Sequence, residues 1–221
     1  MEFRPFPKIP RFFRDITITE KIDGTNASIY IKGGEEDSIE GLPPEHPDIK
    51  FQREYCLAFS GEVAPEIPGG LALYAGSRNR WITPESDNYG FAKWVRDNSS
   101  KLFNLGPGHH FGEWWGNGIQ RNYGLKEKRF SLFNIKRWGE HYKEDGFVEH
   151  TGCYTVPVLY QGLLTDKIID EYLGGLMAMG SYAAPGFMKP EGIIIHHEAG
   201  GHLYKVLLEN DDKPKSVVEN S

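Results

Sequence analysis

The chain is poor in cysteine and has no long apolar run. Its two cysteines, Cys56 and Cys153, lie far apart without a CxxC pair, which argues against a disulfide framework and a zinc site. No stretch is long and apolar enough to predict a membrane span. The N-terminus is aromatic and basic but broken by prolines, so it lacks the continuous apolar core of a signal peptide. We therefore expect a cytoplasmic protein that has no membrane partner.

Basic residues do not dominate the composition either, since the net charge of the 221 residues is -6. This charge argues against a uniformly basic surface but leaves a local basic groove open. Residues 121–143 hold seven cations against two acids: Arg121, Lys126, Lys128, Arg129, Lys136, Arg137 and Lys143. We consider this segment a candidate contact for a nucleic-acid backbone, with an ordinary solvated loop as the alternative.

The pattern of apolar residues predicts an α+β fold with antiparallel sheets and flanking helices. Expected strands cover residues 16–30, 57–63, 110–115, 129–135, 192–196 and 202–208. One helix is expected over 88–104, capped by Ser86 or Asp87 and stopped at Gly106. A second is expected over 166–179, with Thr165 as N-cap and Gly180 at its end. Residues 33–50 read as a polar, proline-rich loop, and 209–221 as a flexible tail.

The apolar stripe of the second helix comprises Ile168, Ile169, Tyr172, Leu173, Leu176 and Met177. No linker divides the sequence, so we expect a single domain over residues 1–221. The histidine pairs 109–110 and 196–197 form no convincing metal site. Adjacent residues on a strand point to opposite faces, and we interpret these histidines as surface residues.

The segment Glu20-Lys21-Ile22-Asp23-Gly24 interrupts a strand pattern with charges and a glycine. Side chains alternate along a strand, so Lys21 and Asp23 are expected to share one face. Taken alone, such a pair is as often a solvated surface contact as a functional one. A lysine within an apolar strand is costly unless it serves a purpose, and a positioned amine is a nucleophile. Gly24 allows a tight turn or a close approach to a ligand, and Asn26 offers an amide for a hydroxyl or phosphate.

Four further short motifs carry polar or aromatic groups on strands. Glu113 lies in an aromatic strand between glycines, and Phe133 lies in a Leu-Phe strand that also reads as plain core. Glu191 precedes a glycine and an apolar strand, where a carboxylate suits a hard metal such as Mg²⁺. Lys205 is a second lysine inside an apolar strand, which favours an anionic ligand over a snorkelling side chain.

In this order, the five motifs resemble the nucleotidyl motifs of the covalent nucleotidyltransferase superfamily. That superfamily contains ATP-dependent DNA ligases, RNA ligases and messenger-RNA capping enzymes. The form Glu-Lys-Ile-Asp-Gly-Thr-Asn, with Asn26 after the motif, looks most like the RNA ligase branch of the bacteriophage RNA ligase 2 type. Ser77-Arg78-Asn79-Arg80 resembles the Ser-Arg motif that follows the lysine motif in ligases. The resemblance spans about residues 20–208.

The resemblance implies an ATP-dependent RNA ligase that uses ATP and Mg²⁺ or Mn²⁺. Lys21, supported by Asp23, would form a covalent lysyl-AMP, pass AMP to a 5′-phosphate end, and allow a 3′-hydroxyl to seal RNA or, as an alternative, DNA. The implied site comprises nucleotide contacts by Glu20, Lys21, Gly24, Asn26, Arg78, Glu113, Phe133 and Lys205, with Glu191 at the metal. Within this set, Glu113 would bind the ribose, Phe133 would stack on adenine, and Lys205 would contact the α-phosphate.

Two positions depart from the family pattern. Leu207 stands where the last motif has a second lysine, and Asn134 stands where the third motif often has an aspartate. Residues 209–221 are too few for a C-terminal OB-fold, so we expect a catalytic core that acts alone or with an accessory protein. The alternatives are a DNA ligase, a capping-type nucleotidyltransferase, or a nucleotide- or RNA-binding module with incomplete catalysis.

Overall fold

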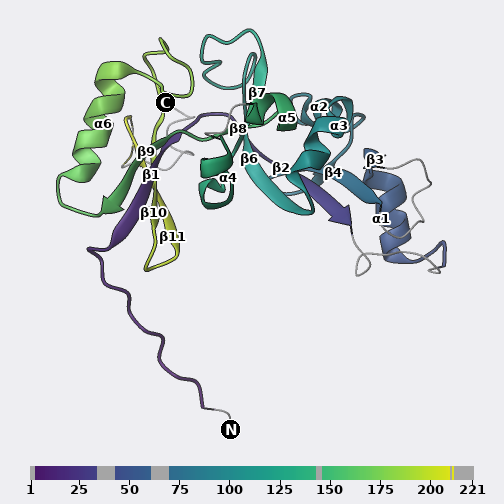
Figure 1. The fold of residues 1–221 in the computed structure, drawn as a ribbon, viewed down its shortest axis with the longest axis horizontal. Coiled ribbons are helices and arrows are strands. Elements are labelled where there is room, and N and C mark those ends of the chain that lie inside the picture. The colour runs from purple at the N-terminus through teal and green to yellow at the C-terminus, as the bar shows by residue number, and fades with distance from the viewer. Residues whose placement is uncertain (1–2, 34–42, 61–69, 143–145, 210, 212–221) are drawn as a thin grey trace, which may run out of the picture. The chain divides into compact units, whose positions relative to one another are not determined.

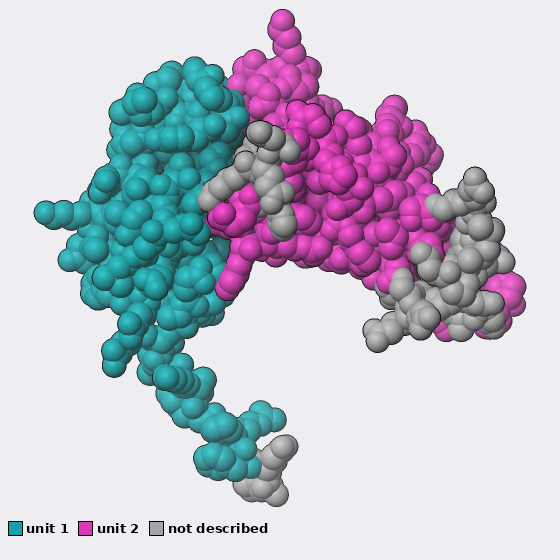
Figure 2. Space-filling model, in the orientation of Figure 1, with its two compact units in different colours: residues 1–22, 156–221 teal, residues 23–155 magenta. Residues whose placement is uncertain are grey.

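The computed structural model describes residues 3–33, 43–60, 70–142, 146–209 and 211 (Figure 1). The chain forms two compact units (Figure 2). Unit 1 comprises Met1–Ile22 and Val156–Ser221, and unit 2 comprises Asp23–Thr155. Both units combine helices with mainly antiparallel strands, which confirms the predicted α+β class. Among the described residues, no helix is both long and apolar enough to cross a bilayer.

Unit 1 is built on a four-stranded antiparallel sheet. In spatial order its strands are β11 (His202–Leu207), β10 (Gly192–His197), β1 (Asp15–Lys21) and β9 (Val158–Leu163). Helix α6 (Ile168–Met179) packs through Leu176 against Ile16 and Ile18 of β1 and the isoleucines of β10. Because side chains alternate along β1, Lys21 lies on the face of the sheet away from this core.

Unit 2 contains a seven-stranded sheet that is antiparallel except where β7 meets β8. Its strands are β3 (Ala58–Ser60), β4 (Leu71–Ser77), β2 (Thr25–Gly33), β6 (Gly108–Gly116), β7 (Lys128–Leu132) and β8 (Tyr154–Thr155), with β5 (Trp81–Ile82) on β4. The helices are α1 (Pro47–Tyr55), α2 (Phe91–Asp97), α3 (Ser99–Leu102), the 3-10 helix η2 (Phe103–Leu105), α4 (Ile135–Tyr142) and α5 (Phe147–Thr151).

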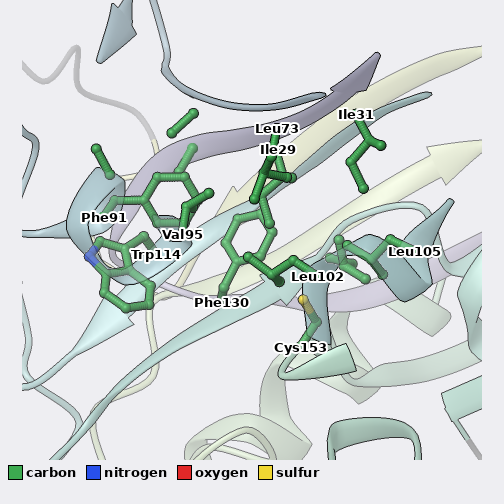
Figure 3. Close-up of a cluster of buried hydrophobic side chains, with 14 of the residues drawn as sticks. Ile29, Ile31, Leu73, Phe91, Val95, Leu102, Leu105, Trp114, Phe130 and Cys153 are labelled. Atoms are coloured by element: carbon green, nitrogen blue, oxygen red, sulfur yellow. The ribbon is translucent and has the colours of Figure 1, made fainter. Parts of the chain in front are cut away.

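The core of unit 2 lies on one face of this sheet. Ile29 and Ile31 of β2 pack with Phe91, Val95 and other buried side chains of the helical segments (Figure 3). Burying these apolar groups contributes about 25 cal/mol per Å² of apolar surface removed from water. The opposite face of the same strands carries the polar and aromatic side chains described below.

The helix expected over 88–104 is divided into α2, α3 and η2. Its predicted start was wrong: α2 begins at Phe91, and Gly90 rather than Ser86 or Asp87 stands at the N-cap position. The Asp87 carboxylate still accepts hydrogen bonds from the backbone N–H groups of Asn88, Ala92 and Lys93. The predicted stop at Gly106 is confirmed: this glycine has φ +70° and its N–H donates to the Phe103 carbonyl. The break falls at Asn98, whose side chain donates to the Trp94 carbonyl.

The second predicted helix is observed with a different start. Helix α6 begins at Ile168 after Lys167, so Thr165 is not its N-cap. Met177 is 67% exposed and does not belong to the apolar stripe, whereas Leu176 is fully buried. The end at Gly180, with φ +79°, is confirmed.

Several local predictions were wrong. The strand expected over 129–135 ends at Leu132, and α4 begins at Ile135. The loop expected over 33–50 gives way to α1 at Pro47, where His46 caps the helix through the N–H of Asp48. Strands β4 and β9 were not expected. Residues 34–42, 61–63, 210 and 212–221, which belong to other predictions, lie outside the described residues.

The prediction that the paired histidines are surface residues was wrong for two of them. His110 and His197 are buried, because backbone groups satisfy their rings. The His110 Nε2 atom lies 2.9 Å from the Gly106 carbonyl, and His197 Nε2 lies 2.7 Å from the Phe12 carbonyl. Burial lowers the pKa of His110. His109 is exposed, so the expected opposite orientation of adjacent side chains is confirmed.

Candidate functional site

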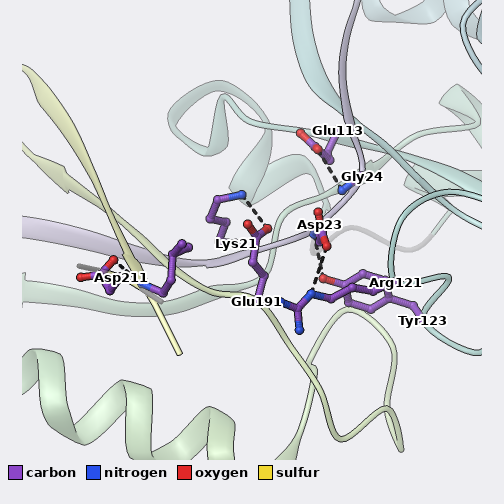
Figure 4. A network of polar contacts seen from close by, with 9 residues as sticks. Lys21, Asp23, Gly24, Glu113, Arg121, Tyr123, Glu191 and Asp211 are labelled. Carbon is purple, nitrogen blue, oxygen red and sulfur yellow. Dashed lines mark hydrogen bonds and ion pairs between the residues drawn. The ribbon is translucent and has the colours of Figure 1, made fainter. Parts of the chain in front are cut away.

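In unit 1, Lys21 and Glu191 form an ion pair across 170 residues of sequence, with Nζ 2.6 Å from Oε2 (Figure 4). The register of β1 and β10 places Lys21 opposite Gly192, which brings Glu191 beside the lysine. The two side chains are only 21% and 6% exposed. A lysine held by a nearly buried carboxylate is a positioned amine. The sequence predicted Asp23 as the support of Lys21 and Glu191 as a metal ligand, and it did not predict this pair.

Gly192 makes this arrangement possible. A Cβ atom at this position would lie 2.2 Å from the Val206 carbonyl oxygen and 2.9 Å from Leu207 Cα. Both obstacles are backbone atoms, which cannot rotate away. The glycine of the Glu-Gly step is therefore needed for the close approach of β11 to β10.

Lys205 lies on the same face of the sheet as Lys21. Cross-strand pairing places Lys205 in one row with Ile194 and Thr19. The next row on the same face contains Leu207, Gly192 and Lys21. Paired residues share a face, and neighbouring rows on one face are two residues apart along each strand. The strand predicted around Lys205 is observed as β11, which lies at the edge of the sheet, and Lys205 is exposed.

Glu20 points to the opposite face and is 1% exposed. Its carboxylate accepts hydrogen bonds from the Ser181 hydroxyl at 2.6 Å and from the N–H groups of Tyr182 and Ala183 at 2.8 Å each. Burial raises the pKa of this carboxyl, while the three donors lower it. The Glu20 carboxylate therefore holds residues 181–183 against β1, and a nucleotide contact by this residue stays a prediction.

In unit 2, Asp23 is held at both its backbone and its side chain (Figure 4). Its carboxylate accepts a hydrogen bond from Arg121 Nε at 3.0 Å, and its N–H donates to the Tyr123 hydroxyl at 2.7 Å. Tyr123 is buried and packs edge-on against Trp115 at 5.0 Å. The loop between β6 and β7 therefore fixes the position of Asp23.

Sequence reasoning did not find Arg121 and Tyr123 as partners of Asp23. Three residues of their loop have left-handed backbone without being glycine: Gln120, Asn122 and Tyr123, with φ of 45°, 63° and 52°. Such conformations cluster where the surrounding structure enforces a local shape. The only sequence signal is the turn-forming Asn-Tyr-Gly run, and it does not say which residue 98 positions away the arginine meets.

Gly24 and Glu113 are joined by a hydrogen bond from the glycine N–H to Oε1 at 3.1 Å. A Cβ at Gly24 would lie 2.5 Å from the Trp114 carbonyl oxygen and 2.7 Å from Trp115 Cβ. The glycine thus permits close approach to β6. Asn26 pairs with Glu113 across β2 and β6, so their side chains share the face opposite the core.

Phe133 and Arg78, two further predicted nucleotide contacts, are exposed. Phe133 follows β7, is 39% exposed, and donates its N–H to the Phe111 carbonyl at 2.9 Å. Arg78 lies in the turn between β4 and β5. Asn134, which replaces the expected acid, accepts a hydrogen bond from the Arg137 N–H at 3.1 Å and so supports the start of α4.

A family model described as RNA ligase matches residues 14–207, which is most of the chain. The chain belongs to the RNA ligase family. This match covers both units and all ten predicted site residues. No relative was found among the curated protein sequences.

Solved RNA ligases from Naegleria gruberi share the fold. A mutant form with ATP and Mn aligns with a TM-score of 0.51 at 17% identity, and a form with pyrophosphate gives 0.51 at 19%. Each alignment covers 94% of this chain and 52% of the Naegleria chain. The present chain therefore corresponds to about half the length of these RNA ligases.

In this member of the RNA ligase family, several cations of the basic segment, residues 121–143, are engaged in contacts within the protein. Four of its cations contact other protein groups: Arg121 binds Asp23, Lys128 donates to the Tyr89 carbonyl, Arg129 binds Glu127, and Arg137 donates to the Leu105 carbonyl. Lys126 and Lys136 are exposed, and Lys143 lies outside the described residues. A backbone contact by this segment stays a prediction.

The donor set for a metal is small. The described part of the chain contains no group of three or more histidine, cysteine, aspartate or glutamate side chains that could hold an ion. Glu191 offers one carboxylate, whose Oε2 contacts Lys21. Magnesium is often bound by one or two carboxylates together with water and substrate phosphates, so this chemistry fits a metal that arrives with a nucleotide.

Proposed function

We propose that this protein is an ATP-dependent RNA ligase that works through a covalent lysyl-AMP. The observation that carries the proposal is the 2.6 Å contact between Lys21 Nζ and Glu191 Oε2. It joins the lysine and glutamate motifs, far apart in sequence, in one polar pair. Membership of the RNA ligase family supports the same reaction.

The reaction consists of three substitutions at phosphorus. The neutral Lys21 amine attacks the α-phosphorus of ATP, a nitrogen–phosphorus bond forms, and the bond to pyrophosphate breaks. An oxygen of a 5′-phosphate end then attacks the same phosphorus and displaces the lysine. Finally a 3′-hydroxyl attacks the activated 5′-phosphate, and AMP leaves with the electrons of the broken bond. Such transfers depend mainly on positioning and charge stabilisation.

The chain's own residues would supply that positioning. Glu191 would orient the Lys21 amine. The Lys21 ammonium group must lose a proton before the attack, because it has no free electron pair. Lys205, on the same sheet face as Lys21, would neutralise charge on the α-phosphate. The Lys205 ammonium group and a metal around one phosphate would lower the cost of the charge that builds up in transfer.

In unit 2, Glu113 would accept hydrogen bonds from the ribose, and Phe133 would stack on adenine. The Gly24 N–H already orients one Glu113 oxygen, and the Phe133 ring is 39% exposed. Arg78 would contact a phosphate of the nucleotide or of the RNA. Asn26 would support the end-joining steps, and Asp23, held by Arg121, would support Lys21 in lysyl-AMP formation.

A divalent cation, Mg²⁺ or Mn²⁺, would be held by Glu191 together with phosphate oxygens and water. When bound, it would neutralise developing charge on the phosphates. Structures of the Naegleria RNA ligase contain ATP or AMP together with Mn, which supports this choice of cofactors.

A second candidate is a nucleotide-binding module with incomplete catalysis. Leu207 favours it, since this apolar residue occupies the cross-strand row of Lys21, where the family pattern has a cation. Such a module would bind ATP without forming the covalent adduct.

Intact-mass measurement after incubation with ATP and Mg²⁺ separates the two candidates. We expect a mass gain of one AMP that disappears in Lys21→Ala and is retained in Lys50→Ala, a change at an exposed lysine of α1. ATP binding without an adduct, under both Mg²⁺ and Mn²⁺, would establish the binding module instead.

A panel of labelled ends then identifies the polynucleotide. Single strands and nicked duplexes with RNA or DNA on each side of the junction are incubated with the adenylylated protein. We expect sealing of RNA 3′-hydroxyl ends. Equal sealing of all-DNA nicks would replace the RNA assignment with a DNA ligase.

A further inference from the structure

A continuous set of rings covers the non-core face of the unit 2 sheet. We define this aromatic face by six residues: Tyr30, Phe51, Tyr74, Trp81, His109 and Phe111. Tyr30 pairs with Tyr74 on β4 and with His109 on β6, so the three side chains share one face. Trp81 pairs with Gly76, where an added Cβ atom would lie 2.6 Å from the Ser28 hydroxyl oxygen and 3.7 Å from the indole.

The rings contact one another in sequence across the sheet. His109 and Phe111 are stacked with centroids 4.1 Å apart, and Trp81 and His109 are stacked at 5.8 Å. Tyr30 lies 5.5 Å from His109, and Phe51 of α1 is stacked on Tyr74 at 5.1 Å. Mutual packing holds each ring in one orientation, so little side-chain entropy is lost when a ligand binds.

This face is open at its β6 end, whereas Tyr74 at its other end is fully buried and stacked against Phe51. Phe111 is 49% exposed, and His109 is also exposed, whereas Ile29 and Ile31 on the core side are at most 1% exposed. Tyr30 and Trp81 are half-buried. Contiguous exposed aromatic surface on a protein commonly marks a binding site.

The aromatic face is continuous with the ring proposed to stack on adenine. Phe133 donates its N–H to the Phe111 carbonyl, one register position beyond the pair of Gly112 and Leu132. Phe133 and Phe111 are thus neighbours on adjacent strands. Glu113, the proposed ribose contact, lies two residues further along β6 on the same face.

Cations flank the rings. Lys32 follows Tyr30 by two residues on β2 and shares its face, and Arg78 and Arg80 lie in the turn that precedes Trp81. The Arg80 guanidinium is held by the Ser86 hydroxyl and carbonyl at 2.9 Å each. Aromatic rings bordered by positive charge match a ligand that offers flat bases and phosphates together.

We propose that the aromatic face binds unpaired nucleobases of the RNA strand whose end is joined, with Phe111 and His109 as stacking surfaces. The proposal rests on the RNA ligase function proposed above and specifies its substrate: the strand beside the junction is single-stranded over this face. Every base offers a π-face, so stacking here tolerates any sequence. Burial lowers the pKa of His109, which favours the neutral ring for stacking.

Fluorescence anisotropy of the full chain tests this proposal with three 5′-phosphorylated probes of equal length: single-stranded RNA, the same backbone without bases, and an RNA duplex. We expect the single strand to bind more tightly than the other two. Phe111→Leu keeps an apolar side chain but removes the ring, and we expect about tenfold weaker binding of the single strand only. Phe111→Trp, which keeps a ring, should bind as well as the unmodified protein.

Tyr204→Leu is the matched control, because Tyr204 is 51% exposed on β11 of the other unit and its loss should leave binding unchanged. His109→Leu provides a second variant of the face itself. Unchanged binding by both Phe111→Leu and His109→Leu overturns the proposal, as does an equal loss for the abasic probe. Lysyl-AMP formation is measured in parallel: its absence in the unmodified protein contradicts the ligase function, whereas a normal adduct with unaltered RNA binding contradicts only the aromatic face.

Discussion

Arg121 Nε donates to Asp23 Oδ2 at 3.0 Å, and both side chains are largely removed from solvent, at 29% and 19% exposure. Arg121 belongs to the loop between β6 and β7, and Asp23 follows Lys21, the proposed nucleophile, by two residues. The ion pair fixes the direction in which the aspartate points. Arg121 is therefore a positioning residue for the proposed reaction.

Replacing Arg121 with methionine should slow lysyl-AMP formation about tenfold, since one lost charge-assisted hydrogen bond of roughly 1.4 kcal/mol corresponds to that factor. Single-turnover measurement of adduct formation at saturating ATP checks this. We expect the affinity for ATP to change less than the rate, and Arg121→Lys to recover part of the rate. Arg53→Met, at an exposed arginine of α1, is the control. An unaltered rate in Arg121→Met would show that Asp23 needs no such support.

Gly24→Ala should destabilise the fold, because the new methyl group would lie 2.5 Å from the Trp114 carbonyl oxygen and 2.7 Å from Trp115 Cβ. Strand β2 must then shift away from β6, at a cost of about 2 kcal/mol or more. Gly174→Ala is the matched control, since no atom lies within 4 Å of a Cβ there and the residue is within α6. Alanine in a helix should stabilise by up to about 1 kcal/mol. Urea unfolding of both variants gives the comparison, and equal stabilities would contradict the packing at Gly24.

Glu20→Gln should lower the free energy of unfolding by about 1–3 kcal/mol, because an amide cannot accept hydrogen bonds at both of its ends. At least one of the donors at Ser181, Tyr182 and Ala183 would lose its hydrogen-bond acceptor. Thermal and urea denaturation measure the effect. The exposed Glu198→Gln change should be close to neutral, and a neutral Glu20→Gln would indicate that residues 181–183 are held by other contacts.

Acidification should destabilise the protein through His110. Burial holds the pKa of this histidine below its ordinary value of 6.5, and the positive charge of Arg137 adds to the shift. Below pH 6.5 the unfolded chain binds a proton that the folded chain does not, so stability falls as the pH drops from 6.5 through the folded pKa. Urea unfolding between pH 5 and 7 should show a smaller loss for His110→Gln, which keeps a donor for the Gly106 carbonyl but does not titrate. Parallel pH dependences in the two proteins would exclude His110 as the source.

Leu207→Lys should speed lysyl-AMP formation several-fold. The residue shares a cross-strand row with Gly192 and Lys21, so an added ammonium group would lie on the face where the α-phosphate is expected. Leu203→Lys, on the same edge strand but two rows further away, is the control and should give no gain. Stopped time-course mass measurements supply both rates. Equal effects of the two substitutions would mean that the charge of the strand matters and its position does not.

The sequence by itself determined the class of fold and predicted the residues that are proposed to carry the chemistry. Strand alternation and the order of the Lys-x-Asp-Gly, Phe-Gly-Glu, Glu-Gly-Ile and Leu-Tyr-Lys motifs were enough to predict an α+β ligase-type domain, because these signals are local. The helix ends at Gly106 and Gly180 were also predictable, since a left-handed backbone at a glycine depends on neighbouring residues alone.

Only the tertiary structure decided how distant residues pair. Lys21 meets Glu191 because the register of β1 on β10 is fixed by burying Ile18 and Ile193 under α6, a contact that no local pattern contains. Glu20 is turned inward by the same alternation. Its carboxylate is satisfied by the Ser181 hydroxyl and by two backbone N–H groups, 161–163 residues away, so its structural role was invisible in the sequence. Arg121 read as part of a basic surface until the β6–β7 loop placed it on Asp23. A strand pattern specifies faces, but the identity of the partner across a face depends on packing of the whole unit.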